Sequence, residues 1–134
     1  MTMRLKSVVP AVVIVAVVVG LGTRSALAIK PFKDAFVAKY VKSDSKDPAA
    51  VAFAAACNKA KCTICHVGKN KKIRNSYGQQ LAKLLHKETD QDNKEKINQA
   101  LEQVAAIKVN PSSADSPTFG DLIQKGKLPG VKAK

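Results

Sequence analysis

Along most of this chain, hydrophobic residues recur every three or four positions, with polar residues between them. That spacing places side chains on one face of an α-helix, whereas a half-buried strand alternates hydrophobic and polar residues at every second position. Polar or proline-containing stretches divide the pattern into segments of helical length. The pattern therefore predicts an all-α fold of about four to five short helices, without internal repeats.

The first two expected helices begin at prolines. Pro31 suits the first turn of a helix, and hydrophobic residues follow it at helical spacing. After a polar break at 43–46, Asp47 and Pro48 have the properties of an N-cap and of a first helical residue. We expect the alanine-rich helix that they begin to run towards Cys57.

Three further helices are expected in the second half of the chain. One covers about 75–87, the next begins at Asp92 with Glu95 three residues later, and the last begins at Ser116 and stops at Gly126. Their hydrophobic faces comprise Tyr77, Leu81, Leu84 and Leu85, then Ile97, Leu101, Val104 and Ala105, then Phe119, Leu122 and Ile123.

The first 28 residues have the organisation of a signal peptide. Arg4 and Lys6 form a short positive region, a valine-rich stretch follows, and small residues end the segment as in a signal-peptidase site. The valine-rich stretch of about 14 residues is shorter than the roughly 20 that cross a bilayer. We predict a signal peptide at 1–28 and one exported domain at 29–134, in the periplasm or an equivalent space; an uncleaved anchor is the alternative.

The strongest chemical motif is Cys62-Thr63-Ile64-Cys65-His66. Two thiols three residues apart, followed at once by a histidine, form the C-x-x-C-H signature of c-type haem attachment. Each thiol adds to one vinyl group of a porphyrin, and the adjoining imidazole becomes the proximal ligand of the iron. The motif predicts one covalently attached haem c, with Cys62, Cys65 and His66 binding the cofactor and His66 binding its iron.

Two other uses of these residues are open. A C-x-x-C pair can form a redox disulfide, although such a motif belongs in a βαβ context that the pattern does not predict. Cys57, Cys62, Cys65 and His66 could also bind zinc, but they lie within ten residues, whereas structural zinc sites usually join two separated ligand pairs.

Three stretches resemble small exported bacterial cytochromes c with a single haem. They are CTICHVGK at 62–69, RNSYGQQLAKLL at 74–85 and TFGDLIQKGKLPG at 118–130. The resemblance implies a cytochrome c-like helical bundle around one haem, and one-electron transfer rather than enzymatic catalysis. A haem-based sensor, or a protein that binds a small ligand at an open distal site, is the alternative function.

The chain departs from the family at the distal side of the iron, where many cytochromes c supply a methionine. Met1 and Met3 are the only methionines, and both lie in the predicted signal peptide. His86 is the only other histidine, and on a helix over 75–87 it would lie on the polar side, away from the leucines. His86, a lysine amine, water and an open position are therefore all candidates.

Cys57 is the odd cysteine and could be a reactive third thiol or form an intermolecular disulfide. We favour a free thiol packed as a small hydrophobic residue, because its helical face also carries Phe53 and Ala54.

Basic residues dominate the predicted mature chain. Of 23 Lys and Arg residues, three lie in the first 28, which leaves 20 against all ten Asp and Glu. Lys69, Lys71, Lys72 and Arg74 follow the motif, in a stretch at 67–75 that we expect to be a basic loop. Such a rim suits an acidic redox partner, with any membrane contact only peripheral. Export, and the scarcity of aromatic residues for base stacking, argue against nucleic acid as the partner. The alternative to an acidic redox partner is a solvated basic surface without a specific partner.

Overall fold

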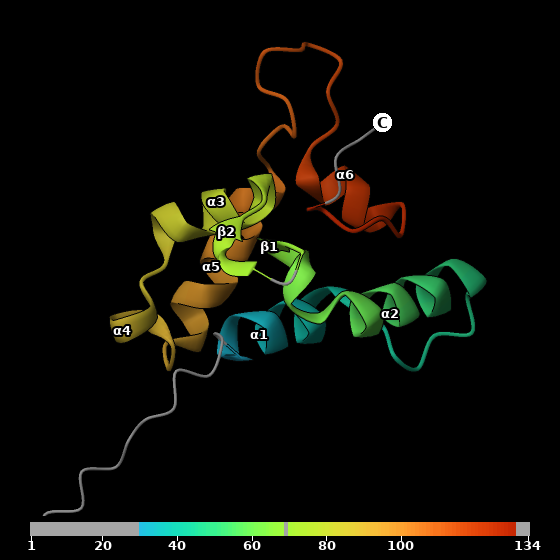
Figure 1. Ribbon diagram of the computed structural model, residues 1–134. Helices are drawn as coiled ribbons and strands as arrows, with labels where there is room; N and C mark the ends of the chain where they lie inside the picture. Colours follow the sequence, from blue (N-terminus) through green and yellow to red (C-terminus); the bar gives the residue numbers. More distant parts are fainter. Residues whose placement is uncertain (1–29, 69, 131–134) are drawn as a thin grey trace, which may run out of the picture.

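Helices make up most of the part of the chain that the computed structural model describes, residues 30–68 and 70–130. The predicted signal peptide at 1–28 lies outside these residues. In chain order, the elements are α1 (Lys30–Tyr40), α2 (Pro48–Ala60), the 3₁₀ turn η1 (Lys61–Ile64), β1 (His66–Val67), β2 (Asn70–Arg74), α3 (Ser76–Leu84), α4 (Lys87–Asp90), α5 (Lys94–Ala105) and α6 (Phe119–Gln124) (Figure 1).

Helix α2 begins as the sequence predicts. The Asp47 side chain accepts a hydrogen bond from the Ala49 N–H at 3.2 Å, and Pro48 is the first helical residue. Two other helices begin slightly later than predicted, because better-placed caps take over. Asn93, not Asp92, caps α5, and Thr118 forms a reciprocal capping box with Asp121 at the start of α6.

The single helix expected at 75–87 is wrong, because the chain leaves helical geometry after Leu84. Leu85 and His86 are extended, and α4 follows as a separate turn of helix. The Asp90 carboxylate accepts the His86 backbone N–H at 2.8 Å, which satisfies a donor at the start of α4. His86 is therefore exposed in a break between two helices, and not on the polar side of one helix.

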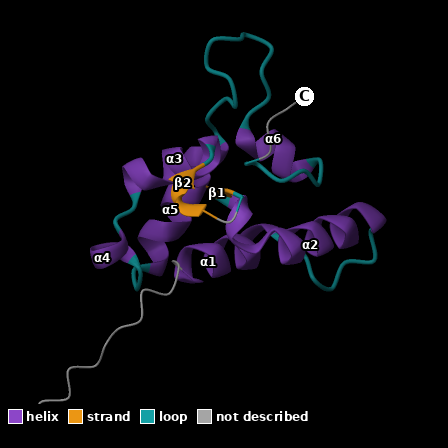
Figure 2. Cartoon of the chain, viewed as in Figure 1, coloured by secondary structure: helices purple, strands orange, loops and turns teal. Residues whose placement is uncertain are grey.

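The basic loop expected at 67–75 is instead a small antiparallel hairpin, coloured orange in Figure 2. His66 pairs with Arg74 and Val67 with Asn70, with an irregularity in the register between the two pairs. Every residue of β2 is exposed, so this strand carries no alternation of buried and exposed positions. The all-α prediction holds only as a mostly helical fold, since the hairpin adds a two-stranded sheet.

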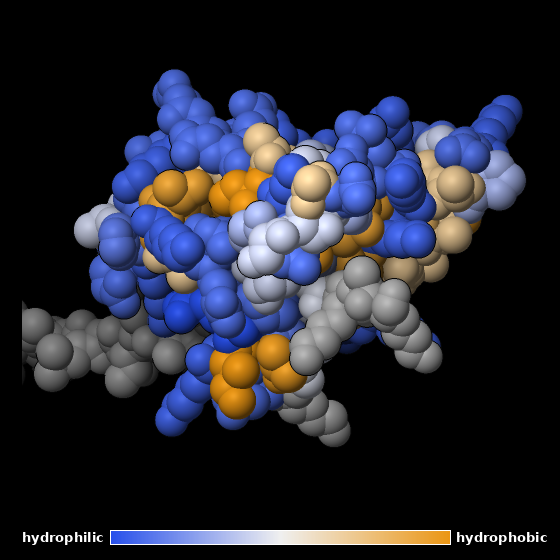
Figure 3. Space-filling model, turned by 90° about the horizontal axis from the view of Figure 1, so that it is seen from above, coloured by the Kyte–Doolittle hydropathy of each residue, from blue (hydrophilic) through white to orange (hydrophobic). Residues whose placement is uncertain are grey.

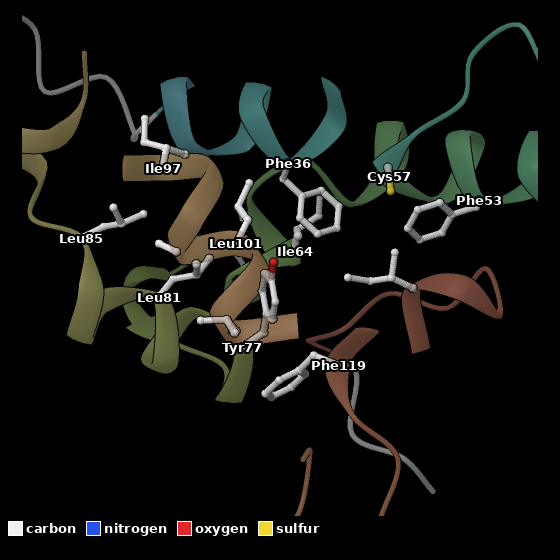
Figure 4. Close-up of a cluster of buried hydrophobic side chains, with 13 residues drawn as sticks. Phe36, Phe53, Cys57, Ile64, Tyr77, Leu81, Leu85, Ile97, Leu101 and Phe119 are labelled. Atoms are coloured by element: carbon white, nitrogen blue, oxygen red, sulfur yellow. The ribbon is translucent and has the colours of Figure 1, made fainter. Parts of the chain in front are cut away.

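The hydrophobic faces predicted for the second half of the chain meet in one buried cluster (Figure 4). Helix α5 packs against α1, α3 and α6, and so lies at the centre of these contacts. Tyr77 on α3 makes edge contacts with Phe36 and Phe119, at ring-centroid distances of 5.8 and 5.3 Å. The buried cluster comprises Phe36, Phe53, Cys57, Ile64, Tyr77, Leu81, Leu85, Ile97, Ala100, Leu101, Val104, Phe119 and Ile123.

The helices leave the hairpin and η1 in the middle of the molecule. In Figure 1, α1 and α2 lie below, α3 and the hairpin lie above, and α4 and α6 lie towards opposite sides. The outer face seen in Figure 3 is mostly hydrophilic, interrupted by separate hydrophobic patches. Among residues 30–68 and 70–130, no helix has both the length and the hydrophobicity needed to span a membrane.

Asp90 provides a test of this fold. It is 4% exposed, it accepts hydrogen bonds from the His86 N–H and from Lys96, and these bonds hold its pKa at about 2 instead of 3.8. Because the folded-state pKa is depressed, this stabilisation is complete above pH 3.8 and is lost as the pH falls towards 2. Asp90→Asn should therefore lower the free energy of unfolding at pH 7, measured by urea denaturation, and the difference from the parent should shrink between pH 4 and pH 2.

Asp92→Asn is the matched control, because Asp92 is an exposed carboxylate two residues away. We expect it to unfold like the parent at every pH. A gap between Asp90→Asn and the parent that stays constant from pH 7 to pH 2 would contradict this role of the Asp90 carboxylate.

Candidate functional site

The C-x-x-C-H motif lies in the turn that joins α2 to the hairpin. Helix α2 ends at Ala60, and Lys61 has a φ of 49°, in the left-handed region that residues other than glycine seldom adopt. Cys62 then lies in η1, the Cys65 N–H donates to the Cys62 carbonyl at 3.3 Å, and His66 begins β1. The turn therefore presents both cysteines and the histidine from consecutive short elements.

Both motif cysteines and His66 line one cavity of about 360 Å³. Small-molecule and cofactor pockets in proteins measure roughly 300–1,000 Å³, so this volume falls within the usual range. The other lining residues are Lys30, Phe32 and Lys33 from α1, Lys61 from η1, Lys71 and Arg74 from β2, Gly78, Leu81 and Ala82 from α3, and Leu85 and Lys87 beyond it.

The lining combines hydrophobic side chains with positive charge. Phe32, Leu81 and Leu85 contribute hydrophobic surface, while five lysines and one arginine supply every charged side chain of the lining. No acidic residue is among those that line the cavity. A hydrophobic group that carries carboxylates would fit both features.

His66 has an unsatisfied nitrogen. Its Nδ1 is buried and has no hydrogen-bond partner among the described residues. Burial is the main cause that lowers the His66 pKa; the Ile73 carbonyl opposes this shift, and the charges of Arg74 and Lys71 add to it. The ring is therefore biased towards the neutral imidazole, which is the form that binds metal ions.

The structure does not bring the ligands of the alternative zinc site together. Cys57 is 1% exposed and packs in the hydrophobic cluster near Phe53 (Figure 4), whereas the other two cysteines line the cavity. Within the described residues, no three His, Cys, Asp or Glu side chains are grouped as a metal site. Burial raises the pKa of the Cys57 thiol, and the expected packing of Cys57 as a small hydrophobic residue is confirmed.

The redox-disulfide alternative lacks its structural context too. The motif joins a helix to an antiparallel hairpin, and no βαβ unit is present in the described residues. Both motif thiols are free, and burial, with a smaller effect from Cys62, raises the pKa of Cys65 to about 12.

Two residues that sequence reasoning missed hold the motif against α3. The Asn75 side-chain amide donates to the carbonyls of Thr63 and Ile64, at 3.1 and 3.0 Å. A Cβ on Gly78 would lie 2.0 Å from the Cys65 carbonyl oxygen, so only glycine fits there. The available signals were an asparagine at a helix start and a glycine inside a helix, where it costs about 1 kcal/mol relative to alanine and therefore suggests a close approach.

The candidate distal ligands differ in whether they line the cavity. His86 is exposed and is not among the residues that line the cavity. Lys33 and Lys87 are half-buried in the cavity wall and form no ion pair with another described residue. Lys30 also lines the cavity, but its amine pairs with Asp34 at 2.7 Å.

Comparison with models of protein families, with curated proteins and with solved structures gave no match to this chain. Its function must therefore be inferred from its own residues and from the cavity that they form.

Proposed function

We propose that this chain is an exported c-type cytochrome that carries one electron at a time on a single, covalently attached haem. One observation carries the proposal: Cys62, Cys65 and His66 line the same cavity, together with hydrophobic side chains and six basic ones. The fold supports the proposal only at the coarser level of a mostly helical chain with a small sheet.

The residues present fit a haem. The two thiols could each form a thioether with one vinyl group, and the neutral imidazole of His66 could bind the iron. Hydrophobic side chains such as Phe32 and Leu81 would cover the porphyrin faces, and the lysines and Arg74 could pair with its two propionates.

Haem supplies a reversible one-electron couple at iron. The chain determines where the haem lies in the molecule and which molecules can approach it. The thioethers to Cys62 and Cys65 would prevent the cofactor from dissociating. His66 would bind the iron, and its backbone is held in place by pairing with Arg74 in the hairpin. The hydrophobic wall would exclude water and so limit reorganisation when the charge on iron changes.

The first test is the covalent bond itself. Protein matured in a host that makes c-type cytochromes should exceed the mass of the polypeptide from Ile29 to Lys134 by one haem. Cys62→Ser and Cys65→Ser should each remove one thioether and leave one vinyl group of the haem unreacted. The pyridine haemochrome spectrum detects that vinyl group, whereas intact mass does not, because addition of a thiol to a vinyl group loses no atoms. Cys57→Ser is the matched control and should keep one haem, because Cys57 lies outside the cavity. Haem that acid acetone extracts from the parent would contradict the proposal.

Sensing or small-ligand binding is the second candidate function. It is favoured by the position of His86 outside the cavity lining and by the lack of methionine in the predicted mature chain. A sensor needs an open or easily vacated axial position, whereas a carrier is better served by a strong sixth ligand, which limits reorganisation.

Carbon monoxide distinguishes the two functions. For a carrier, we expect the reduced parent to refuse carbon monoxide, and its oxidised spectrum to lack the near-infrared band of sulfur-ligated iron. His86→Ala should leave both results unchanged. Binding of carbon monoxide after Lys33→Ala or Lys87→Ala, but not after Lys83→Ala on the exposed side of α3, would identify a cavity amine as the sixth ligand. Rapid binding by the parent would instead establish the sensor function.

The partner that we propose is an acidic redox protein. The hairpin beside the cavity exposes Lys71, Lys72 and Arg74, and it also exposes Val67 and Ile73, at 51% and 52%. Positive charge would steer an acidic partner, and two exposed hydrophobic side chains would provide a small contact surface. This combination suits a brief, weak encounter.

Salt dependence tests this docking surface. Neutralising Lys71, Lys72 and Arg74 to glutamine should slow electron exchange with an acidic acceptor protein at low ionic strength. The difference should fade towards physiological salt, where the Debye length is about 8 Å. The matched control neutralises Lys94, Lys125 and Lys127, three exposed lysines that do not line the cavity. Equal slowing by the two triple variants would mean that only net charge matters, and that the hairpin is not the docking surface.

A further inference from the structure

Asn75 makes more hydrogen bonds to the motif than the capping of a helix requires. Its backbone N–H donates to the Cys65 carbonyl at 3.0 Å, and its side-chain amide donates to the carbonyls of Thr63 and Ile64. Its side-chain oxygen accepts the Gly78 N–H at 2.9 Å, which caps α3. We call these four bonds the Asn75 clamp.

The clamp is enclosed from two sides. Gly78 lies against the Cys65 carbonyl on the α3 side, with no space for a Cβ. On another side, a Cβ on Gly130 would lie 1.9 Å from the Asn75 amide nitrogen and 2.6 Å from the Ile64 carbonyl oxygen. Asn75 itself is 8% exposed. The motif turn, the first turn of α3 and the distant Gly130 therefore converge on this one side chain.

The other side-chain N-caps in the described residues do not have this arrangement. Asp47 and Asn93 each accept one backbone N–H of their own helix and are exposed. The Thr118 hydroxyl likewise accepts one N–H of its own helix, that of Asp121, within its capping box. Serine, aspartate and asparagine serve almost equally well as N-caps. Capping alone therefore does not require asparagine at position 75; the two bonds donated to the motif do, because only the amide supplies both an acceptor and two donors.

We propose that Asn75 is the positioning residue of the C-x-x-C-H turn: it holds the carbonyls of Thr63, Ile64 and Cys65 against α3, and so sets the direction in which Cys65 and His66 face the cavity. In its consequences for iron, this proposal rests on the proposed function. A buried carbonyl that loses its donor is costly, so without the amide the turn would shift to find other partners. His66 follows Cys65 directly and would move with it.

Replacing Asn75 by aspartate or serine tests the side-chain NH₂ group of Asn75 separately from its role as the N-cap of α3. Both keep an acceptor for the Gly78 N–H, so α3 keeps its cap, but neither supplies two donors to the Thr63 and Ile64 carbonyls. The matched controls are Asn93→Asp and Asn93→Ser, which make the same exchanges at the cap of α5, away from the cavity. Using two substitutions keeps the test informative if one variant does not fold.

The first measurement is amide hydrogen exchange on the full chain purified as the cell exports it. Loss of the two donated bonds should speed exchange at the Cys65 amide about tenfold relative to the Leu101 amide in α5. A purely structural role would speed both amides together, and the Asn93 variants should leave their ratio unchanged. An unchanged ratio in both Asn75 variants would overturn the proposal.

The second measurement is the reduction potential of the haem-loaded protein. A well-held imidazole stabilises oxidised iron, so the uncharged variant Asn75→Ser should have a higher potential than the parent, and Asn93→Ser the same potential. Asn75→Asp is left out of this comparison, because a buried carboxylate near iron would itself lower the potential. Equal potentials in the parent and in both serine variants would show that the clamp does not position His66. If the parent holds no covalent haem, the proposed function fails, while the exchange ratio still decides whether Asn75 holds the turn.

Discussion

The close contact between the motif turn and the start of α3 is the constraint on which the cavity depends. Asn75 ties three consecutive carbonyls of the turn to the first residues of that helix, and Gly78 removes the Cβ that would keep the two apart. Once they meet, α3 can supply hydrophobic wall beside Cys65 and His66. A looser junction would widen the cavity and separate the cysteines from that wall.

At Tyr77, the free energy gained by burying the ring opposes the cost of a hydroxyl without a hydrogen bond. Its hydroxyl points towards Ile64 (Figure 4) and has no hydrogen-bond partner among the described residues, which costs about 1–3 kcal/mol. Edge contacts with Phe36 and Phe119 return about 0.5–1.5 kcal/mol each. Burial of the ring adds roughly 4–6 kcal/mol, from 150–250 Å² at about 25 cal/mol per Å². Ring burial therefore decides the balance, and burial also raises the pKa of Tyr77, which keeps its hydroxyl neutral.

Hydrophobic periodicity predicted the helices and their buried faces because burial acts on every turn of a helix, as at Leu81 and Leu101. It could not predict the hairpin, whose second strand is wholly exposed. Nor could it predict the break at Leu85, after which the Asp90 carboxylate accepts the His86 N–H, because a bond between a side chain and the backbone has no hydrophobic period. The C-x-x-C-H motif predicted three residues of the candidate site, Cys62, Cys65 and His66. The hydrogen bonds from Asn75 to the motif, and the part of the cavity wall that α1 supplies, join separate segments of the chain. Such contacts leave no periodic signal in the sequence.

The charge of the cavity bears on what it holds. Lys61, Lys71 and Arg74 lie around one hollow with three further lysines, and no acidic side chain shares its lining. Like charges gathered around one hollow repel one another, although water screens the four exposed ones, Lys30, Lys61, Lys71 and Arg74. Folding alone gains nothing from such an arrangement. A bound group with carboxylates would offset the repulsion, so the same residues that destabilise an empty cavity would stabilise a filled one, and binding and folding would be thermodynamically linked.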